Sequence, residues 1–454
     1  MKYFKTLFLP VVFLLGIHSI ICGQITQQYR DVKISEMIKE ISSANLESNV
    51  RKMVSFSTRH TFSTRTEKEK GIGTACNWIK SEFEKYLKDS EGRLEVKLDS
   101  IYLEPDTRRI TRKVLLTNVV ATLKGTDPGD KRIFIVGGHL DSRNSEANDS
   151  VGTAPGANDD ASGVSAVLEL ARVMSKRNFP ATIIFVAFSG EEQGLNGSTF
   201  LAKKAKEQNW NVVAMLNNDM IGNTFSNETL LKDNMQVRVF SEAIPSSETD
   251  AQKNIRQSTN AENDSPSRQL ARYIKEIGEL YVDQLEVKLI YRNDRVLRGG
   301  DHTPFNRQGF TAVRFCEMNE NYNYQHQNVR EENGIKYGDL PENIDFEYTR
   351  KIVSVNASVL SNLALAPGAP QNVGVVISGL TNSTTLKWNI PQGKIPKGYF
   401  ILMRETYKPL WERIFFTDKT EITLPYSKDN YFFAVQSVDE EGHKSLPVWP
   451  VPVR

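Results

Sequence analysis

Three apolar segments of this chain each end in a short motif that contains acids or a histidine. The segments are residues 132–137, 182–189 and 212–216, and the motifs at their ends read GGHLD, SGEE and NND. Helical patterns at residues 163–174 and 195–208 separate the segments. Strands that alternate with helices predict a mostly parallel sheet with helices on both faces. The three motifs are therefore expected to converge in one crevice beyond the carboxyl ends of the strands, where open α/β sheets bind their ligands.

The length of the chain and a change of pattern near residue 366 predict two domains. At 454 residues the chain is longer than one average domain. The segment APGAP at residues 366–370 separates a large α/β domain at 24–366 from a smaller domain at 367–454. We expect a mostly parallel mixed sheet flanked by helices in the first, with a polar insertion at residues 223–266. Short strand-like runs in the second predict an all-β sandwich.

The first 23 residues have the layout of a secretory signal peptide. Lys2 and Lys5 precede an apolar run at residues 7–22, and small or polar residues follow it. This layout predicts export to a secreted or periplasmic location, with cleavage near residue 23. A membrane anchor is the competing interpretation, but the run is short for a membrane span. A lipoprotein with Cys22 as the lipidated residue is a further alternative.

Composition narrows the classes of protein to which the chain can belong. Charged residues make up 25% and hydrophobic residues 39%, as in an ordinary soluble protein with no stable membrane span. Without Lys2 and Lys5, basic and acidic residues are equal in number, so the charge balance indicates no nucleic-acid partner. Beyond the signal peptide only Cys76 and Cys316 remain. Buried thiols are the preferred interpretation for this pair, and a disulfide stays open.

Five side chains from the strand-end motifs and from two further motifs form a complete set of metal ligands. They are His139, Asp159, Glu192, Asp219 and His302. Two imidazoles with three carboxylates suit two divalent ions of the zinc type. Two such ions about 3.5–4 Å apart, together with a base, can hydrolyse an amide bond. Glu191 directly precedes a ligand, where a general base is needed. Asp141 lies two residues after His139, on the same side of an extended segment, and can support its imidazole.

The motifs GHLDS, PGANDDASG, SGEEQG, NNDMIG and DHTPF resemble those of the M28 family of zinc peptidases, which includes bacterial leucyl-type aminopeptidases. The resemblance extends over the larger domain and implies a site with two zinc ions bridged by Asp159. It also implies that Asp219 and His302 complete one zinc site, whereas His139 and Glu192 complete the other.

This resemblance implies a secreted aminopeptidase that removes N-terminal residues from peptides or proteins with a free N-terminus. Glu191 would be the general base, Asp141 the support of the neighbouring imidazole, and the peptide bond between Asp159 and Asp160 would be cis. Contacts to the substrate are expected from four further side chains, which are Asp301, Tyr322, Tyr324 and His326.

Three other functions remain open from the sequence. A glutaminyl cyclase shares this fold but typically uses one zinc ion, and the full ligand set argues against it. A di-zinc carboxypeptidase needs a basic pocket for the substrate carboxylate, for which Arg298 and Arg314 are candidates without an evident cluster. A non-catalytic extracellular binding protein should have lost a ligand or the base, and none is lost.

The smaller domain resembles a fibronectin type III domain. Trp388 occupies the position of the core tryptophan, and Tyr431 begins a strand like the one that carries the tyrosine of that family. The resemblance leaves a polymer, a cell surface or another protein open as the partner of this domain.

Overall fold

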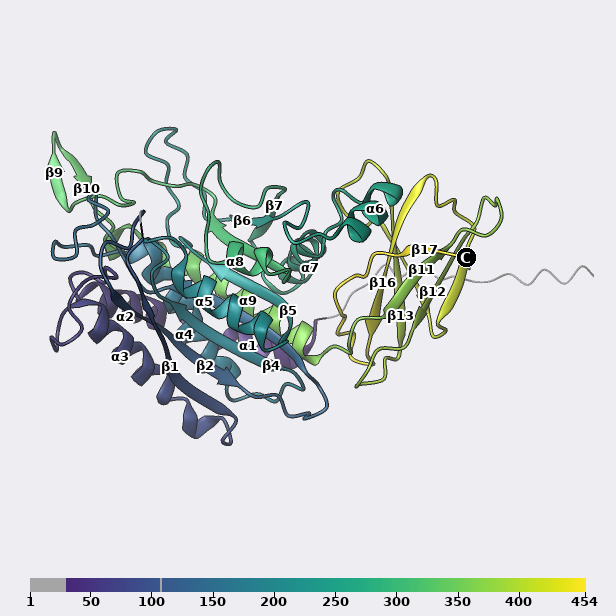
Figure 1. The fold of residues 1–454 in the computed structure, drawn as a ribbon, viewed down its shortest axis with the longest axis horizontal. Coiled ribbons are helices and arrows are strands. Elements are labelled where there is room, and N and C mark those ends of the chain that lie inside the picture. The colour runs from purple at the N-terminus through teal and green to yellow at the C-terminus, as the bar shows by residue number, and fades with distance from the viewer. Residues whose placement is uncertain (1–29, 107) are drawn as a thin grey trace, which may run out of the picture.

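The computed structural model describes residues 30–106 and 108–454, and an eight-stranded mixed sheet forms the centre of the larger domain (Figure 1). In spatial order its strands are β1 (Leu94–Leu103), β2 (Val114–Leu123), β4 (Thr182–Phe188), β3 (Arg132–His139), β5 (Asn211–Asn218), β8 (Ala312–Glu317), β6 (Gln236–Ser241) and β7 (Glu286–Ile290). The middle strands β4, β3, β5 and β8 are parallel neighbours, whereas β1, β2 and β6 introduce antiparallel pairs. The predicted fold class is confirmed.

Helices cover both faces of this sheet, as the alternation of strands and helices predicts. They are α1 (Val32–Lys39), α2 (Ser43–Val54), α3 (Gly71–Glu84), α4 (Ser162–Met174), α5 (Asn196–Glu207), α7 (Pro266–Tyr281), α8 (His302–Arg307) and α9 (Phe346–Leu365), whereas α6 (Asp250–Thr259) buries no residue. Phe134 and Val136 of β3 pack in the core formed with α1–α4, α7 and α9. Ile135, between them, packs in the opposite core with α5 and α8. Successive strand residues thus face opposite layers.

Two parts of the large sheet differ from the expectation. The polar insertion expected at residues 223–266 contains β6, which pairs with β7 and β8, as well as the exposed helix α6. The sheet also includes β1, an edge strand whose side chains are largely exposed. Both strands carry many polar residues, so no continuous apolar run marks them in the sequence. A small hairpin of β9 (Arg330–Glu332) and β10 (Ile335–Tyr337) projects from this domain (Figure 1).

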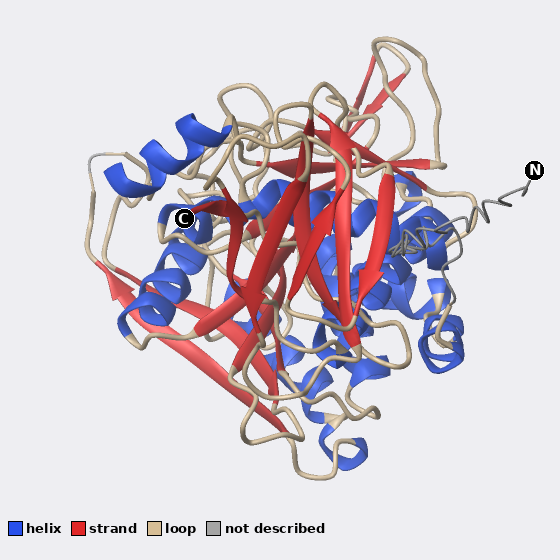
Figure 2. Ribbon diagram, turned by 90° about the vertical axis from the view of Figure 1, so that its right-hand side faces the viewer, coloured by secondary structure: helices blue, strands red, loops and turns tan. Residues whose placement is uncertain are grey.

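The C-terminal residues form two separate small sheets. One contains β11 (Gln371–Val376), β12 (Thr384–Asn389), β15 (Glu421–Leu424) and β17 (Val451–Val453), and the other β13 (Gly398–Glu405), β14 (Arg413–Thr417) and β16 (Tyr431–Val438). Trp388 and Leu386 from the first sheet share one core with Ile401 and Val435 from the second, which makes the pair a sandwich. Figure 2 views the molecule from this end, with strands of both small sheets toward the reader.

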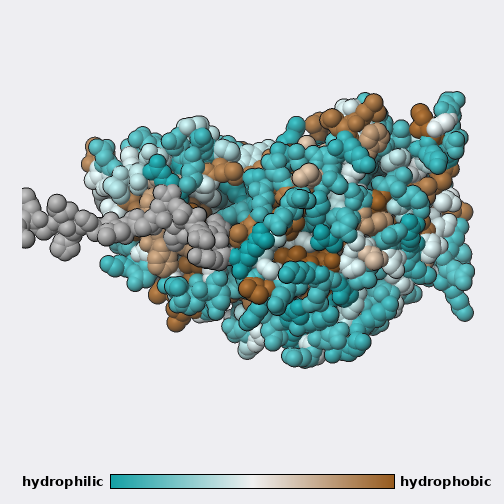
Figure 3. All heavy atoms as spheres, turned by 180° about the vertical axis from the view of Figure 1, so that it is seen from behind, coloured by the Kyte–Doolittle hydropathy of each residue, from teal (hydrophilic) through white to brown (hydrophobic). Residues whose placement is uncertain are grey.

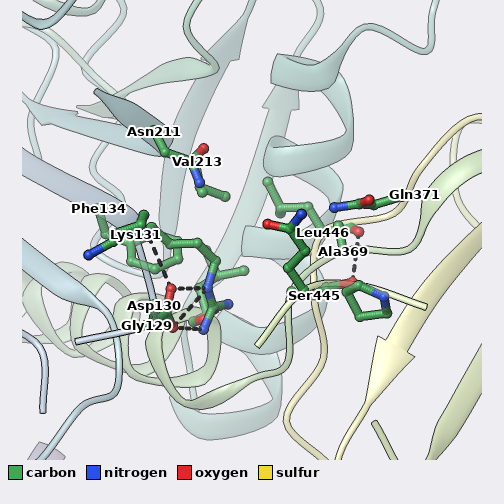
Figure 4. Close-up of a pocket in the computed structure, with 15 residues that line it drawn as sticks. Gly129, Asp130, Lys131, Phe134, Asn211, Val213, Ala369, Gln371, Ser445 and Leu446 are labelled. Atoms are coloured by element: carbon green, nitrogen blue, oxygen red, sulfur yellow. Dashed lines mark hydrogen bonds and ion pairs between the residues drawn. The ribbon is translucent and has the colours of Figure 1, made fainter. Parts of the chain in front are cut away.

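Buried ion pairs and hydrogen bonds join the sandwich to the larger domain. Asp264 lies 2.8 Å from Arg272 of α7 and 2.7 Å from Arg404 of β13, and all three side chains are buried. At the linker, Arg132 of β3 pairs at 2.6 Å with Asp130, which is labelled in Figure 4. Arg132 also donates to the carbonyl oxygens of residues 363, 366 and 367. A cationic side chain at these carbonyls suits the C-terminal end of α9.

Other expectations concern the chain termini and the cysteines. The predicted signal peptide lies outside the described residues. Within residues 30–106 and 108–454, no helix combines the length and the apolar character that a bilayer crossing needs. Cys76 and Cys316 are both free and buried. On the face drawn in Figure 3, hydrophilic residues predominate and hydrophobic side chains form small separate groups.

Candidate metal centre and active site

Five side chains converge at the carboxyl ends of β3, β4 and β5 and form two overlapping groups of metal-ligand type. One group is His139, Asp159 and Asp219, and the other is Asp159, Glu192 and His326. Within each group the ligand atoms lie within 4.8 Å of one another. His139 is the last residue of β3, and Asp219 directly follows β5. The expectation that the strand-end motifs meet in one place therefore holds for the structure.

Asp159 belongs to both groups because its two oxygens face different imidazoles. Its Oδ1 lies 3.0 Å from Nε2 of His139, and its Oδ2 lies 3.0 Å from Nε2 of His326. The same His326 nitrogen is 2.8 Å from Oε1 of Glu192, and Asp219 Oδ1 is 4.0 Å from Nε2 of His139. Nitrogen and carboxylate donors in this combination fit an ion of the zinc type.

The two adjacent aspartates have different partners. Asp160 is fully buried and accepts hydrogen bonds from the backbone N–H groups of His139 at 2.9 Å, Gly163 at 2.9 Å and Met220 at 3.2 Å. It thereby fixes the end of β3, the start of α4 and the segment after β5 relative to one another. Asp159 is left to face the imidazoles, and the peptide bond between the two aspartates is cis, as the family resemblance implies.

Asp141 holds the segment that carries the candidate base. Its carboxylate accepts the backbone N–H groups of Glu191 at 3.2 Å and Glu192 at 3.1 Å. Nδ1 of His139 lies 3.1 Å from the backbone carbonyl oxygen of Asp141 and 3.8 Å from its carboxylate. The carbonyl is therefore the nearer partner of the imidazole, and the carboxylate orients both glutamates.

Glu191 faces the pocket beside the ligand groups. Burial raises the pKa of Glu191 well above its ordinary value, and the charges of Asp219 and Glu192 raise it further, whereas His139 opposes the shift. A carboxyl group that holds a proton more tightly than usual is suited to accept one near neutral pH.

The structure contradicts the expected role of His302. Its Nε2 donates to the carbonyl oxygen of Asn293 at 2.8 Å, and its fully buried ring does not line the pocket. His302 is the first residue of α8, whose packing against the sheet turns the ring toward the loop before the helix. His326, expected to contact substrate, occupies the ligand position instead. The ligand pairs are corrected accordingly, because His139 groups with Asp219 and Glu192 groups with His326.

The remaining predicted residues have different locations. Tyr322 lines the pocket, whereas Asp301 and Tyr324 do not. Asp301 is buried at the start of α8, where burial raises its pKa to about 7 although the charge of His139 opposes the shift. Arg314 is committed to buried ion pairs with Asp219 at 2.8 Å and Asp294 at 3.1 Å.

The pocket above the ligand groups has a volume of about 720 Å³. The loop after β8 supplies Tyr322, Gln325 and His326 to its wall. Gln325 donates to Oδ2 of Asp159 at 3.0 Å, so this loop contacts the shared carboxylate twice. Sequence reasoning placed the loop near the substrate but missed its contribution to the ligand set. The signal available was a histidine in a tyrosine- and asparagine-rich segment after a buried strand.

Comparisons with known proteins agree with this geometry. A model of Peptidase family M28 matches residues 118–345. A probable zinc metalloprotease of Leptosphaeria maculans is 43% identical over 92% of this chain and 97% of its own length. Another, from Pyricularia oryzae, is 41% identical over 94% of this chain and 86% of its own length.

Solved structures share the fold at lower identity. The LapA aminopeptidase of Legionella pneumophila has a TM-score of 0.51 and 21% identity, over 74% of this chain and 78% of that protein. LapB from the same organism has a TM-score of 0.52 and 19% identity, over 77% and 78%. Together with the family match and the close relatives, the buried nitrogen and carboxylate donors lead to one conclusion: the chain belongs to peptidase family M28, and it is a zinc metallopeptidase.

Proposed function

We propose that the protein is an exported aminopeptidase with two zinc ions in one co-catalytic centre. The observation that carries this proposal is Asp159, whose two oxygens each face a different imidazole at 3.0 Å. A carboxylate in this position can bridge two ions. His139 and Asp219 would complete one ion's ligands, and Glu192 and His326 would complete those of the other.

The side chains around the centre would have different roles in peptide hydrolysis. Zinc ions, when bound, polarise the scissile carbonyl and lower the pKa of a coordinated water. Glu191 would take a proton from the water and pass it to the departing amine. Asp141 holds the backbone of Glu191 through its hydrogen bond and so keeps the base at a fixed distance from the ligands.

A free α-amine is a cation near neutral pH, and the carboxylates at the metal edge supply a negative environment for it. Glu191, Asp219 and Glu192 all line the pocket within this cluster. This environment supports removal of N-terminal residues. The presence of five ligand side chains supports two ions over the single ion typical of a glutaminyl cyclase.

A panel of aminoacyl chromogenic substrates, each free or N-acetylated, tests the proposal. We expect hydrolysis of the free set alone, loss of activity with a chelator, and recovery when zinc is added. Equal hydrolysis of the acetylated set would refute the aminopeptidase assignment. Activity that is indifferent to the chelator would refute the zinc mechanism as a whole.

The export part of the proposal rests on the sequence of residues 1–23. Expression of the full chain in a host with a secretory pathway, followed by N-terminal sequencing of the product, tests it. A mature N-terminus near residue 24 in the exported fraction is the expected result. An intact Met1 on protein retained inside the cell would contradict export.

A further inference from the structure

Five arginines line the part of the pocket wall that lies outside the ligand cluster. The pocket is lined by Arg108, Arg109, Arg143, Arg295 and Arg298. They come from three separate segments, namely the connection between β1 and β2, the loop after β3, and the loop between β7 and α8. Three segments that are distant in sequence thus each contribute positive charge to the pocket wall.

Most of this charge has little compensation from protein carboxylates. Arg295 and Arg298 lie 3.0 and 2.9 Å from Oε2 of Glu320. The other oxygen of Glu320, Oε1, lies 2.7 Å from Arg238. One carboxylate thus serves three guanidinium groups, and Arg295 has a second partner in Asp294 at 3.2 Å, which itself also pairs with Arg314. In the described ranges, Arg108 and Arg143 form no ion pair.

Arg109 likewise has no carboxylate partner among the described residues, and its guanidinium donates to the backbone carbonyl oxygen of Glu192. The acid next to it, Asp106, accepts backbone N–H groups of residues 108 and 109 at 2.8 Å each. This carboxylate is bound by the backbone of its own loop and forms no ion pair with Arg108 or Arg109 in the part of the chain that the structure describes.

The acids of the ligand cluster do not cancel the arginines once zinc is bound. Asp159, Glu191, Glu192 and Asp219 are the pocket acids of that cluster, and two divalent ions would match their combined charge. Asp106 is then the one remaining acid among the lining residues, against five arginines, of which Arg295 and Arg298 pair with Glu320 outside the pocket. The arginine-bearing part of the wall therefore attracts anionic groups of a bound peptide.

We propose that this pocket selects peptides with acidic side chains close to the scissile bond. The inference rests on the proposed peptidase function and specifies its substrate class. Guanidinium groups bind carboxylates through charge-assisted and often bidentate hydrogen bonds. A single terminal carboxylate needs one such group, whereas arginines from three segments fit several carboxylates spread along a peptide.

Measuring peptide binding to an inactive variant tests this inference independently of the proposed reaction. The probe is the zinc-loaded Glu191→Gln variant, titrated by calorimetry with the peptide amides Glu-Glu-Ala and Gln-Gln-Ala. These two peptides have equal size and the same uncharged C-terminus, so side-chain charge is what distinguishes them. We expect the acidic peptide to bind about tenfold more tightly, because two or more charge-assisted contacts of modest strength combine.

Two substitutions locate the source of the preference. Arg108→Gln and Arg143→Gln, made together in the same background, should reduce the preference to about threefold or less. Arg307→Gln is the matched control, because Arg307 is exposed, lies outside the pocket and forms no ion pair within the described chain. It should leave the preference intact. Raising NaCl to about 0.5 M should weaken the preference in the parent protein through screening.

Equal affinity for the two amides would overturn the inference even if the unmodified enzyme hydrolyses peptides. An equal gain from the free C-terminal carboxylate of Gln-Gln-Ala would also overturn it, because the arginines would then recognise a chain terminus. Preferential binding of the acidic amide supports the inference. If the unmodified zinc-loaded protein then hydrolysed neither peptide, the proposed reaction would fail while the substrate class stood.

Discussion

Replacement of His326 by alanine tests the corrected ligand set directly. Its Nε2 lies 2.8 Å from Glu192 and 3.0 Å from Asp159, so removal of the imidazole takes one donor from a three-residue group. Changes in residues that merely support metal ligands reduce affinity about 10–100-fold. Loss of a direct ligand should exceed that, which corresponds to more than about 2.7 kcal/mol of binding free energy.

Zinc stoichiometry after dialysis against a competing chelator measures this effect. The parent protein should retain two ions, and His326→Ala should retain about one. His302→Ala is the control, because this imidazole bonds to the carbonyl oxygen of Asn293 and not to a ligand. It should lower the free energy of unfolding by about 1–3 kcal/mol through an unpaired buried carbonyl, yet keep both ions. Zinc loss in His302→Ala with full retention in His326→Ala would refute the reasoning.

Four further results are expected. Glu191→Gln should keep its zinc by mass spectrometry but lose about 10²–10⁴-fold in turnover; zinc loss would make this residue a ligand. Burial alone would lower the pKa of His326, but Glu192 and Asp159 raise it to about 10 in the metal-free protein. Zinc must displace that proton, so chelator competition should show affinity rising with pH by up to about tenfold per unit between roughly pH 6.5 and 10. Burial also lowers the pKa of His443, but hydrogen bonds to Asp439 and Asp31 outweigh it and raise the pKa. His443 therefore stabilises the fold below its unfolded pKa of about 6.5, and this stabilisation is lost as the pH rises through the pKa of the folded state. In urea unfolding, His443→Gln should destabilise the protein more at pH 5.5 than at pH 9. Asp264→Asn should lower the free energy of unfolding by about 3–5 kcal/mol, because two buried arginines lose their counter-charge, and an unchanged urea midpoint would contradict this.

The central strands were predictable because each is a short apolar run bounded by turns or helices. Residues 132–137 and 182–189, for example, become β3 and β4. The edge strand β1 was not predictable in this way, because an edge needs little burial and charged residues interrupt its apolar ones. Strand β6 has six residues inside a polar region, too few for a period-two pattern to stand out.

The ligands at strand ends were predictable for a related physical reason. His139 and Asp219 occupy positions that the sheet itself fixes, at the end of β3 and directly after β5. His326 lies on an irregular loop with a φ of 55°, and it reaches Glu192 across 134 positions of the sequence. No periodic pattern places such a residue. His302 was assigned as a ligand from the motif DHTPF and the family resemblance, whereas the position of α8 directs its Nε2 to the carbonyl oxygen of Asn293.

The C-terminal sandwich contacts the end of β7, from which the loop that carries Arg295 and Arg298 leads to the pocket. Tyr291 directly follows β7, and its ring lies 3.9 Å from the guanidinium carbon of Arg268. Its hydroxyl donates to the carbonyl oxygen of Pro409 in the sandwich at 3.2 Å, and Arg272 donates to the same oxygen at 2.6 Å. Arg295 follows Tyr291 by four residues and already lines the pocket. Because the base of this loop is clamped between α7 and the sandwich, the small domain supports one wall of the substrate pocket.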